Sequence, residues 1–268
     1  MSRPKVSIIL PSIRPENLFR WYLAAEKACE CHSWEVIIVS PYSLPPALDG
    51  IANIKYLKSD RTPTVCKQVG ILLAAGRYLF NTTDDAILKP NSIDEIVALY
   101  EKNHIGPFGI VNGRYREGAL DVQTLEPLAN LPPELPPEYW NAHHHQSLRL
   151  PGIDKNNKIS LHFFMLLDTF YKIGGLNCVD YEYSVFPILE LNFRLAFYGG
   201  QIIDSTHEVS WCSHLPNAEG DHGPIAGAMQ QDELMFQQRW QSNIHARNIN
   251  IDYENWKSVD RKWGRRFV

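Results

Sequence analysis

Short apolar runs alternate with segments of helical spacing along the first hundred residues. Runs rich in β-branched residues predict buried strands, whereas apolar residues three and four positions apart predict helices. The predicted strands cover residues 5–10, 34–39, 54–57 and 78–80, and the predicted helices cover 16–31, 64–75 and 92–102. Within 64–75, the residues expected on the buried face are Val65, Val69, Leu72 and Leu73.

This alternation predicts an α/β fold in which helices cover both faces of a mostly parallel sheet. Ligands of such sheets bind at the carboxyl ends of the strands. Here those ends lead into the segments 11–14, 40–42 and 82–85, which are rich in polar residues. We therefore expect these three segments to build a ligand site.

The second half of the chain is less regular. Six of its 18 prolines fall within residues 127–151, which excludes a helix or a central strand there and predicts a long loop or lid. The elements predicted beyond it are a strand leading into a helix over 159–173, a helix over 187–198, short strands at 201–203 and 209–211, and a helix with a tail from residue 230.

Composition places the chain among ordinary globular proteins. It has 268 residues, 21% charged residues and a net charge of −4, which excludes a disordered chain and a predominantly basic nucleic-acid binder. No run approaches the roughly 20 apolar residues that span a bilayer, and Pro11 ends the first apolar run too early for a signal peptide. The five widely spaced cysteines form no zinc pattern, so we expect free thiols in a cytoplasmic protein.

The sharpest local feature is a pair of acids, Asp84 and Asp85, directly after the fourth predicted strand. Two adjacent carboxylates beside a buried strand are unfavourable unless a cation or hydrogen bonds compensate them. A divalent cation shared with the diphosphate of a nucleotide would do so. The alternative is an aspartate that caps a turn before Pro90.

Five segments occur in an order that is typical of one family. Residues 74–85 read AAGRYLFNTTDD and residues 190–199 read ELNFRLAFYG. The first resembles the AxGxYxxxxDxD segment, and the second the DLxxRxxxxG helix, of GT-A glycosyltransferases, especially glycosyltransferase family 2. Residues 6–14 and 35–39 resemble that family's first two strands, and 168–176 resembles its mid-chain helix with a Gly-Gly turn. The resemblance implies the GT-A fold, a Rossmann-like sheet that binds nucleotide-diphosphate sugars.

The resemblance also implies a divalent cation, Mn²⁺ or Mg²⁺. Asp85 corresponds to the last aspartate of the motif and is the implied metal ligand together with His214, to which His222 is an alternative. Asp84 corresponds to the middle position, near the ribose or the phosphates of the donor. Thr83 stands in place of the first aspartate, which removes one carboxylate from the motif.

Further donor-binding residues are implied by the same resemblance. Besides Asp84 they are Pro11, Ser12, Arg14, Ser40, Asp60, Arg61 and Lys67. The first three correspond to the loop around the nucleobase and ribose, and the last three to groups near the base and the diphosphate. Ser40 replaces the aspartate that usually reads the base, so the resemblance leaves the base open, although we expect a UDP-sugar.

The resemblance does not carry over a catalytic base. The family usually has an acidic pair about seven residues before the arginine that corresponds to Arg194, and those positions are Pro187 and Ile188 here. Glu182 is the first candidate for the base and Asp180 the second. We expect the aromatic residues around Glu182 to bury its carboxyl, because burial makes a carboxyl group more basic.

The predicted activity is the transfer of a sugar from a UDP-sugar to an acceptor hydroxyl by one in-line displacement, with inversion at the anomeric carbon and help from a metal. The expected acceptor is a glycan or a lipid-linked molecule, which fits polysaccharide or glycan synthesis. A catalytically degenerate nucleotide-sugar-binding protein is the alternative. A nucleotidyltransferase is a third hypothesis, but residues 11–15 lack the glycine that its first loop typically has.

We expect one GT-A domain over residues 1–225 and a C-terminal helical, basic tail over 226–268. Within the domain, 1–105 would form the nucleotide-sugar half and 106–225 the acceptor half. The basic residues and two tryptophans of the tail predict either contact with an anionic membrane surface or simple packing on the domain. The three histidines at 143–145 predict an exposed loop or a lid that touches the acceptor.

Overall fold

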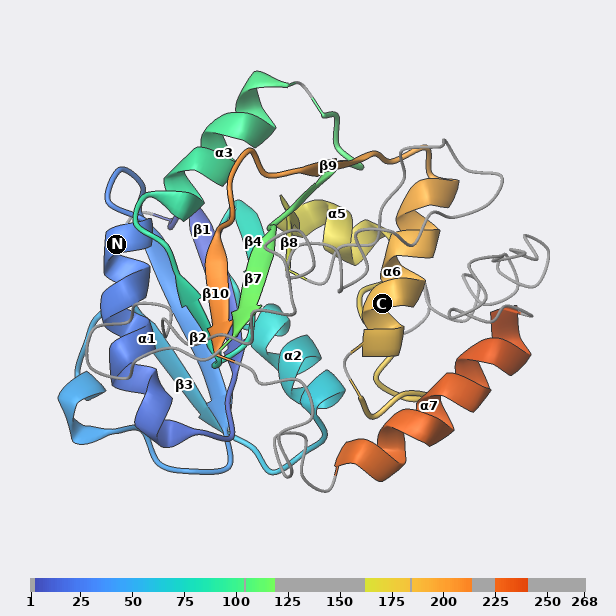
Figure 1. Ribbon diagram of the computed structural model, residues 1–268, viewed down its shortest axis with the longest axis horizontal. Helices are drawn as coiled ribbons and strands as arrows, with labels where there is room; N and C mark the ends of the chain where they lie inside the picture. The colour runs from blue at the N-terminus through green and yellow to red at the C-terminus, as the bar shows by residue number, and fades with distance from the viewer. Residues whose placement is uncertain (1–2, 104, 119–161, 184, 214–224, 241–268) are drawn as a thin grey trace.

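The computed structural model describes residues 3–103, 105–118, 162–183, 185–213 and 225–240 (Figure 1). Its strands are β1 (Val6–Pro11), β2 (Trp34–Ser40), β3 (Ile54–Lys58), β4 (Tyr78–Asn81), β5 (Ala86–Leu88), β6 (Ile110–Asn112), β7 (Tyr115–Gly118), β8 (Phe163–Leu166), β9 (Ile202–Asp204) and β10 (Ser210–Ser213). Its helices are α1 (Pro15–Ala28), α2 (Pro63–Leu72), α3 (Ser92–Lys102), α5 (Leu167–Lys172), α6 (Val185–Phe197) and α7 (Ile225–Trp240), with a 3-10 turn η1 (Pro46–Leu48). Among the described helices, none has the length and apolar character needed to cross a membrane.

The described strands form two sheets. The large sheet has the order β3-β2-β1-β4-β8-β6-β9, and the small sheet has the order β5-β10-β7. Strands β3, β2, β1 and β4 run parallel to one another, whereas β8 is antiparallel to both β4 and β6. The predicted α/β class and mostly parallel sheet are therefore confirmed.

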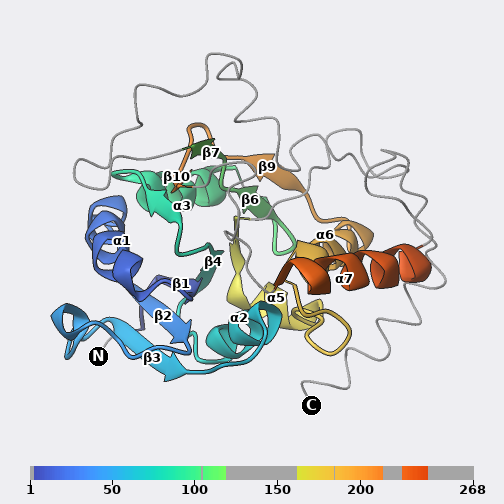
Figure 2. The same ribbon diagram turned by 60° about the horizontal axis from the view of Figure 1, so that its bottom comes forward.

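Helices cover both faces of the large sheet, with α1 and α3 on one side and α2 and α5 on the other (Figure 2). Successive side chains of β1 point to opposite faces of the sheet. Ile8 is buried in the core that contains Trp21 of α1, whereas Ile9 is buried in the core that contains Ile71 of α2 and Phe170 of α5. Because both faces are covered, these strands are apolar at almost every position, which made their sequence signal strong.

Helix α2 turns a different side to the sheet from the one predicted. Leu72 and Leu73 were expected to be buried but are 52% and 42% exposed. The buried residues are instead Thr64, Cys66, Lys67, Gln68, Gly70 and Ile71. A Cβ atom on Gly70 would lie 3.1 Å from a methyl group of Ile9 and 3.2 Å from one of Val39, so the missing side chain lets α2 lie close against β1 and β2. This orientation buries polar side chains of α2 against the sheet.

The glycine of the AxGxY-like run belongs to a tightly packed corner at the amino ends of the strands. A Cβ atom on Gly76 would come within 2.6 Å of Ser7 N. Gly76 N donates a hydrogen bond to Ser7 Oγ at 2.8 Å, and Ser7 Oγ donates to Glu35 Oε1 at 2.6 Å. Lys55 Nζ lies 2.7 Å from Glu35 Oε2. Sheet packing therefore explains this part of the motif.

Helix α7 packs against α6 through an aromatic cluster. Phe236 of α7 is fully buried, and its ring centroid lies 5.6 Å from those of both Phe186 and Phe193 in α6. Tyr181, in the turn before α6, joins the same cluster. The predicted C-terminal helix thus exists and begins at Ile225, earlier than residue 230.

Some predictions have no counterpart in the described structure. The proline-rich segment 127–151 with its three histidines lies outside the described residues, as do His214, His222 and the tail from residue 241. Conversely, the sequence predictions omit the short strands β5, β6 and β7.

Candidate functional site

Polar side chains meet at the carboxyl ends of β1 and β4. These strands are parallel neighbours, so the segment 12–14 after β1 and the segment 82–85 after β4 leave the sheet at the same edge. Ser12 N donates a hydrogen bond to Val39 O at 2.9 Å, which ties the first segment to the end of β2. The fold thereby joins residues that are about 70 positions apart in the chain.

Asp84 is buried and holds the loop that follows β1. Its Oδ2 accepts hydrogen bonds from Ser12 Oγ at 2.9 Å and from the backbone N–H groups of Ile13 and Arg14 at 3.2 Å each. Its Oδ1 lies 2.6 Å from Arg14 Nη1. Burial raises the pKa of Asp84, and the positive charge of Arg14 opposes this rise. These four donors offset the cost of burying the carboxylate.

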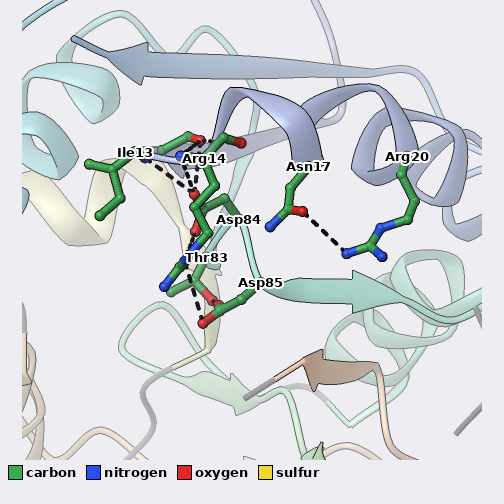
Figure 3. Close-up of polar contacts among 8 residues, drawn as sticks. Ile13, Arg14, Asn17, Arg20, Thr83, Asp84 and Asp85 are labelled. Carbon is green, nitrogen blue, oxygen red and sulfur yellow. Dashed lines mark hydrogen bonds and ion pairs between the residues drawn. The ribbon is translucent and has the colours of Figure 1, made fainter. Parts of the chain in front are cut away.

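Asp85 is the more accessible carboxylate of the pair. Its side chain is 19% exposed, against 6% for Asp84. Thr83 Oγ1 donates a hydrogen bond to Asp85 Oδ1, and Arg14 Nη1 lies 3.7 Å from Asp85 Oδ2. Figure 3 shows the Arg14 side chain directed toward both carboxylates. Asp85 is therefore the member of the pair that can contact a ligand from the solvent side.

Lys67 of α2 brings a second positive charge to the aspartate pair. The residue is only 3% exposed. Burial lowers the pKa of its ammonium group to about 8, against the opposing attraction of Asp85 and Asp84. When Lys67 and Arg14 are both charged, two cations balance two carboxylates. These four described residues then carry no net charge before any ligand binds.

Four other predicted donor-binding residues lie along the same edge of the sheet. Pro11 is the last residue of β1 and Ser40 is the last residue of β2. The Ser40 carbonyl accepts a hydrogen bond from Ser59 N at 2.9 Å, which places the end of β3 beside the end of β2. Asp60 and Arg61 follow at this point and are exposed. Within the described residues, no hydrogen bond joins these four residues to the aspartate pair.

The two predicted catalytic acids lie in the turn between α5 and α6. Glu182 is exposed, so the expected burial of its carboxyl is wrong. Its neighbour Tyr181 turns into the aromatic core beside Phe236 and leaves Glu182 on the outside. Asp180 Oδ2 accepts a hydrogen bond from Asn177 Nδ2 at 2.9 Å, and Asp180 N donates to Asn177 Oδ1 at 3.2 Å. Asp180 therefore helps to close this turn.

A buried aspartate on α7 holds the backbone of the same turn. Asp232 is 3% exposed, and its oxygens accept hydrogen bonds from Glu182 N at 3.0 and 3.1 Å and from Tyr183 N at 2.5 Å. Burial raises the pKa of Asp232, and these backbone hydrogen bonds oppose the rise. The Glu182 carbonyl in turn accepts a hydrogen bond from Thr64 Oγ1 at 2.9 Å, at the start of α2. Sequence reasoning missed Asp232, because one acid on a polar helix carries no distinguishing signal.

The DLxxR-like segment is explained by packing in the described structure. Arg194 is fully buried and donates hydrogen bonds from Nη1 to the Ile173 carbonyl and from Nη2 to the Gly175 carbonyl. Gly174 and Gly175 have φ values of 91° and 66°, in the left-handed region that favours glycine. Ile188, at one of the two positions where acids were expected, is buried in an apolar core. These positions therefore serve the core rather than the chemistry.

The residues around Asp85 fit a divalent cation that is shared with a phosphate ligand. Mg²⁺ and similar ions take oxygen ligands and often combine one or two carboxylates with substrate phosphates. Asp85 offers one accessible carboxylate, whereas Asp84 is engaged by the β1 loop. Across the described ranges, no group of three or more His, Cys, Asp or Glu side chains could hold a metal without further ligands, and His214 lies outside those ranges.

The order of the strands and the antiparallel β8 are consistent with a GT-A-like fold. The crystal structure of S. aureus TarS, residues 1–349, superimposes with a TM-score of 0.53 at 10% identity, over 91% of this chain and 68% of that chain. No family model and no curated protein sequence matches the chain. At this low identity the similarity establishes the fold alone.

Proposed function

We propose that this chain is a glycosyltransferase that uses a nucleoside-diphosphate sugar, with a UDP-sugar as the expected donor and a glycan or lipid-linked molecule as the acceptor. The main support is the meeting of Arg14 and Lys67 with Asp84 and Asp85 at the carboxyl edge of a GT-A-like sheet. A diphosphate is an anion that two nearby cations attract, and a carboxylate pair suits a divalent cation or a ribose hydroxyl. The proposed cation is Mn²⁺ or Mg²⁺, bound at Asp85.

In the proposed reaction an acceptor oxygen gives up its proton and attacks the anomeric carbon of the sugar. The bond from that carbon to the diphosphate breaks on the opposite side, so the configuration inverts. Negative charge grows on the departing diphosphate, and the charges of Lys67 and Arg14 stabilise it in a partly buried site. A divalent cation at Asp85, when bound, supplies additional neutralisation of the same charge.

Glu182 is the proposed base, and Asp180 is the second candidate. The Glu182 side chain is exposed, while its backbone is fixed between Asp232 of α7 and Thr64 of α2. Thr64 and Lys67 are less than one helical turn apart on α2. The proposed base is thereby anchored to the same helix that carries a charge of the donor site.

A nucleotide-sugar-binding protein without catalysis is the second candidate function. The apolar, buried Ile188 and the neighbouring Pro187 favour it, because acids were expected at these positions. Both candidates bind the donor, but only the enzyme separates the sugar from the nucleotide.

The proposal is tested in two steps. Thermal unfolding is measured with UDP-, GDP-, dTDP- and CDP-sugars, each with and without Mn²⁺, because a ligand that binds the folded state raises the melting temperature. Slow release of free UDP is then measured with the stabilising donor. We expect release by the wild type and a loss of about 100-fold or more in Glu182→Gln. The exposed Glu95→Gln on α3 is the matched control and should behave as the wild type.

Three results would each change the proposal in a different way. Stabilisation by a donor without any release of nucleotide supports the non-catalytic binder. Release that is unchanged in Glu182→Gln removes this residue from the mechanism and moves the test to Asp180→Asn. No stabilisation by any of the four nucleotide-sugar classes contradicts the proposed function itself.

A further inference from the structure

Arg14 occupies an unusual position for a residue that was expected to bind a nucleobase or ribose. One guanidinium nitrogen, Nη1, lies 2.6 Å from Asp84 Oδ1 and 3.7 Å from Asp85 Oδ2. The positive charge of Arg14 therefore lies between the two carboxylates, where the resemblance places the divalent cation (Figure 3).

The loop around Arg14 fixes this arrangement. Ser12 Oγ, Ile13 N and Arg14 N all donate hydrogen bonds to Asp84 Oδ2, so the same carboxylate holds both the backbone and the guanidinium of Arg14. The Asp84 side chain is 6% exposed and that of Arg14 is 24% exposed, so solvent screens the contact weakly. The ion pair is thus a built part of the site rather than a passing contact of surface side chains.

Arg20 offers a nearby comparison. It lies on α1, six residues after Arg14, and its Nη2 lies 3.4 Å from Asn17 Oδ1. Figure 3 shows its guanidinium turned toward Asn17, and among the described residues no ion pair joins Arg20 to Asp84 or Asp85. Of these two arginines, Arg14 therefore forms ion pairs with the aspartates, whereas Arg20 contacts Asn17.

The net charge of these side chains determines how strongly they attract a metal ion. Among the described residues Asp84 and Asp85 are matched by Arg14 and Lys67, so a divalent cation alone would meet no net charge on these four residues and be repelled by a guanidinium close to its ligand Asp85. A diphosphate that arrives with the ion adds negative charge and offers the guanidinium new acceptor oxygens.

We infer that Arg14 is the resident counter-ion of the aspartate pair and competes with a divalent cation for Asp85. The inference deepens the proposed function, on which it rests for the identity of the site. The competition by Arg14 makes metal binding weak in the free protein and strong in the presence of a nucleoside diphosphate. The metal and the donor then enter the site together, and Arg14 passes from Asp85 to the phosphates.

The experiment measures binding of Mn²⁺ alone to the full chain by electron paramagnetic resonance, which counts free Mn²⁺ directly. The variant Arg14→Gln removes the competing charge, and Arg14→Lys keeps a charge at that position. Arg20→Gln is the matched control for a charge removed from the same segment. We expect Arg14→Gln to bind Mn²⁺ at least about tenfold more tightly than the wild type, and the other two variants to stay within about twofold of it.

Equal Mn²⁺ affinity in all four proteins, including no measurable binding in any of them, overturns the inference, as does weaker binding by Arg14→Gln. If Arg14→Gln does not fold, the wild type provides the measurement. The side-chain Nε resonance of Arg14 should then shift with Mg²⁺ and UDP together and stay in place with Mg²⁺ alone at the same concentration. A shift with Mg²⁺ alone equal to that with both, or no shift with either, overturns the inference.

These outcomes are separate from the test of the proposed function. Donor-dependent UDP release together with unchanged Mn²⁺ affinity in Arg14→Gln would remove the counter-ion role and leave the glycosyltransferase proposal standing. Tighter Mn²⁺ binding in Arg14→Gln without any nucleotide-sugar binding would do the reverse.

Discussion

Asp84 and Asp232 are both almost completely buried, but the two regions that they organise differ in what they offer to a ligand. Asp84 binds a serine hydroxyl, two backbone N–H groups and a guanidinium. Asp232 binds the backbone N–H groups of the Glu182 turn. The first arrangement gathers charged side chains, whereas the second fixes the path of the chain and leaves the Glu182 carboxyl exposed.

The comparison shows that a buried carboxylate can serve either a site or a scaffold, and that its partners reveal which. At the aspartate pair one partner is the charged side chain of Arg14, which a ligand can replace. At the Glu182 turn the partners are backbone groups, which no ligand can replace without opening the turn. We therefore expect substitutions at the aspartate pair to weaken ligand binding. Substitutions at the Glu182 turn should lower stability and leave ligand binding nearly unchanged.

The largest effect is expected for Asp84→Ala. This change leaves the Arg14 guanidinium and three further donors without their acceptor, and we expect unfolding in urea to be easier by about 2–3 kcal/mol. Asp85→Ala, the matched variant, should cost less than about 1 kcal/mol because its side chain is more exposed. Both variants should lose metal-dependent UDP binding. Equal destabilisation by the two variants would contradict the anchoring role of Asp84.

A smaller loss is expected for Asp232→Ala. It removes the acceptor of two backbone N–H groups, and we expect a loss of about 2 kcal/mol in the free energy of unfolding. Asp232→Asn keeps one acceptor oxygen and should fall between this variant and the wild type. UDP affinity, measured by calorimetry, should stay within about twofold in both variants, because the aspartate pair is untouched. A loss of UDP affinity as large as that of Asp85→Ala would show that the two regions are not separate.

The smallest effect concerns the pH dependence of UDP binding. Burial lowers the pKa of Lys67 to about 8, so its charge is present below pH 8 and is lost above it in the free protein. A bound diphosphate favours the charged form, so the Kd for UDP with Mg²⁺ should rise by up to about tenfold per pH unit above pH 8. Calorimetry between pH 7 and 9.5 measures this slope. Lys67→Met should bind UDP more weakly at pH 7 and show a flatter profile, whereas parallel profiles would exclude Lys67 as the titrating group.

The sequence predicted the polar edge after β1 and β4 better than the turn before α6, for a physical reason. The strands β1 and β2 are buried on both faces, so their apolar runs were easy to recognise in the sequence. Because the two strands are parallel, their carboxyl ends lie at the same edge of the sheet. Asp84 and Asp85 follow such a strand directly, so a local pattern was enough to find them. Their engagement by Arg14 could not be predicted, because the rotamer of a long side chain is set only in three dimensions.

The surroundings of Glu182 could not be predicted because they depend on residues about 50 positions later in the chain. Aromatic neighbours suggested burial, yet Tyr181 turns inward, toward Phe236 of α7, while Glu182 stays exposed. The orientation of α2 was mispredicted for a similar reason. Its leucines defined an apolar side, but the close approach of Gly70 to β1 and β2 decided which side meets the sheet.

Helix α2 is a ten-residue rod that holds the Glu182 carbonyl through Thr64 in its first turn and carries Lys67 beside the aspartate pair in its second. An acceptor that shifted the Glu182 turn would have to stretch the Thr64 contact or move the rod. If the rod moves, Lys67 moves with it, and the occupancy of one substrate then changes the free energy of binding the other. Thermodynamic reciprocity then requires that a donor which tightens acceptor binding by some factor is itself held more tightly, by the same factor, once the acceptor is present.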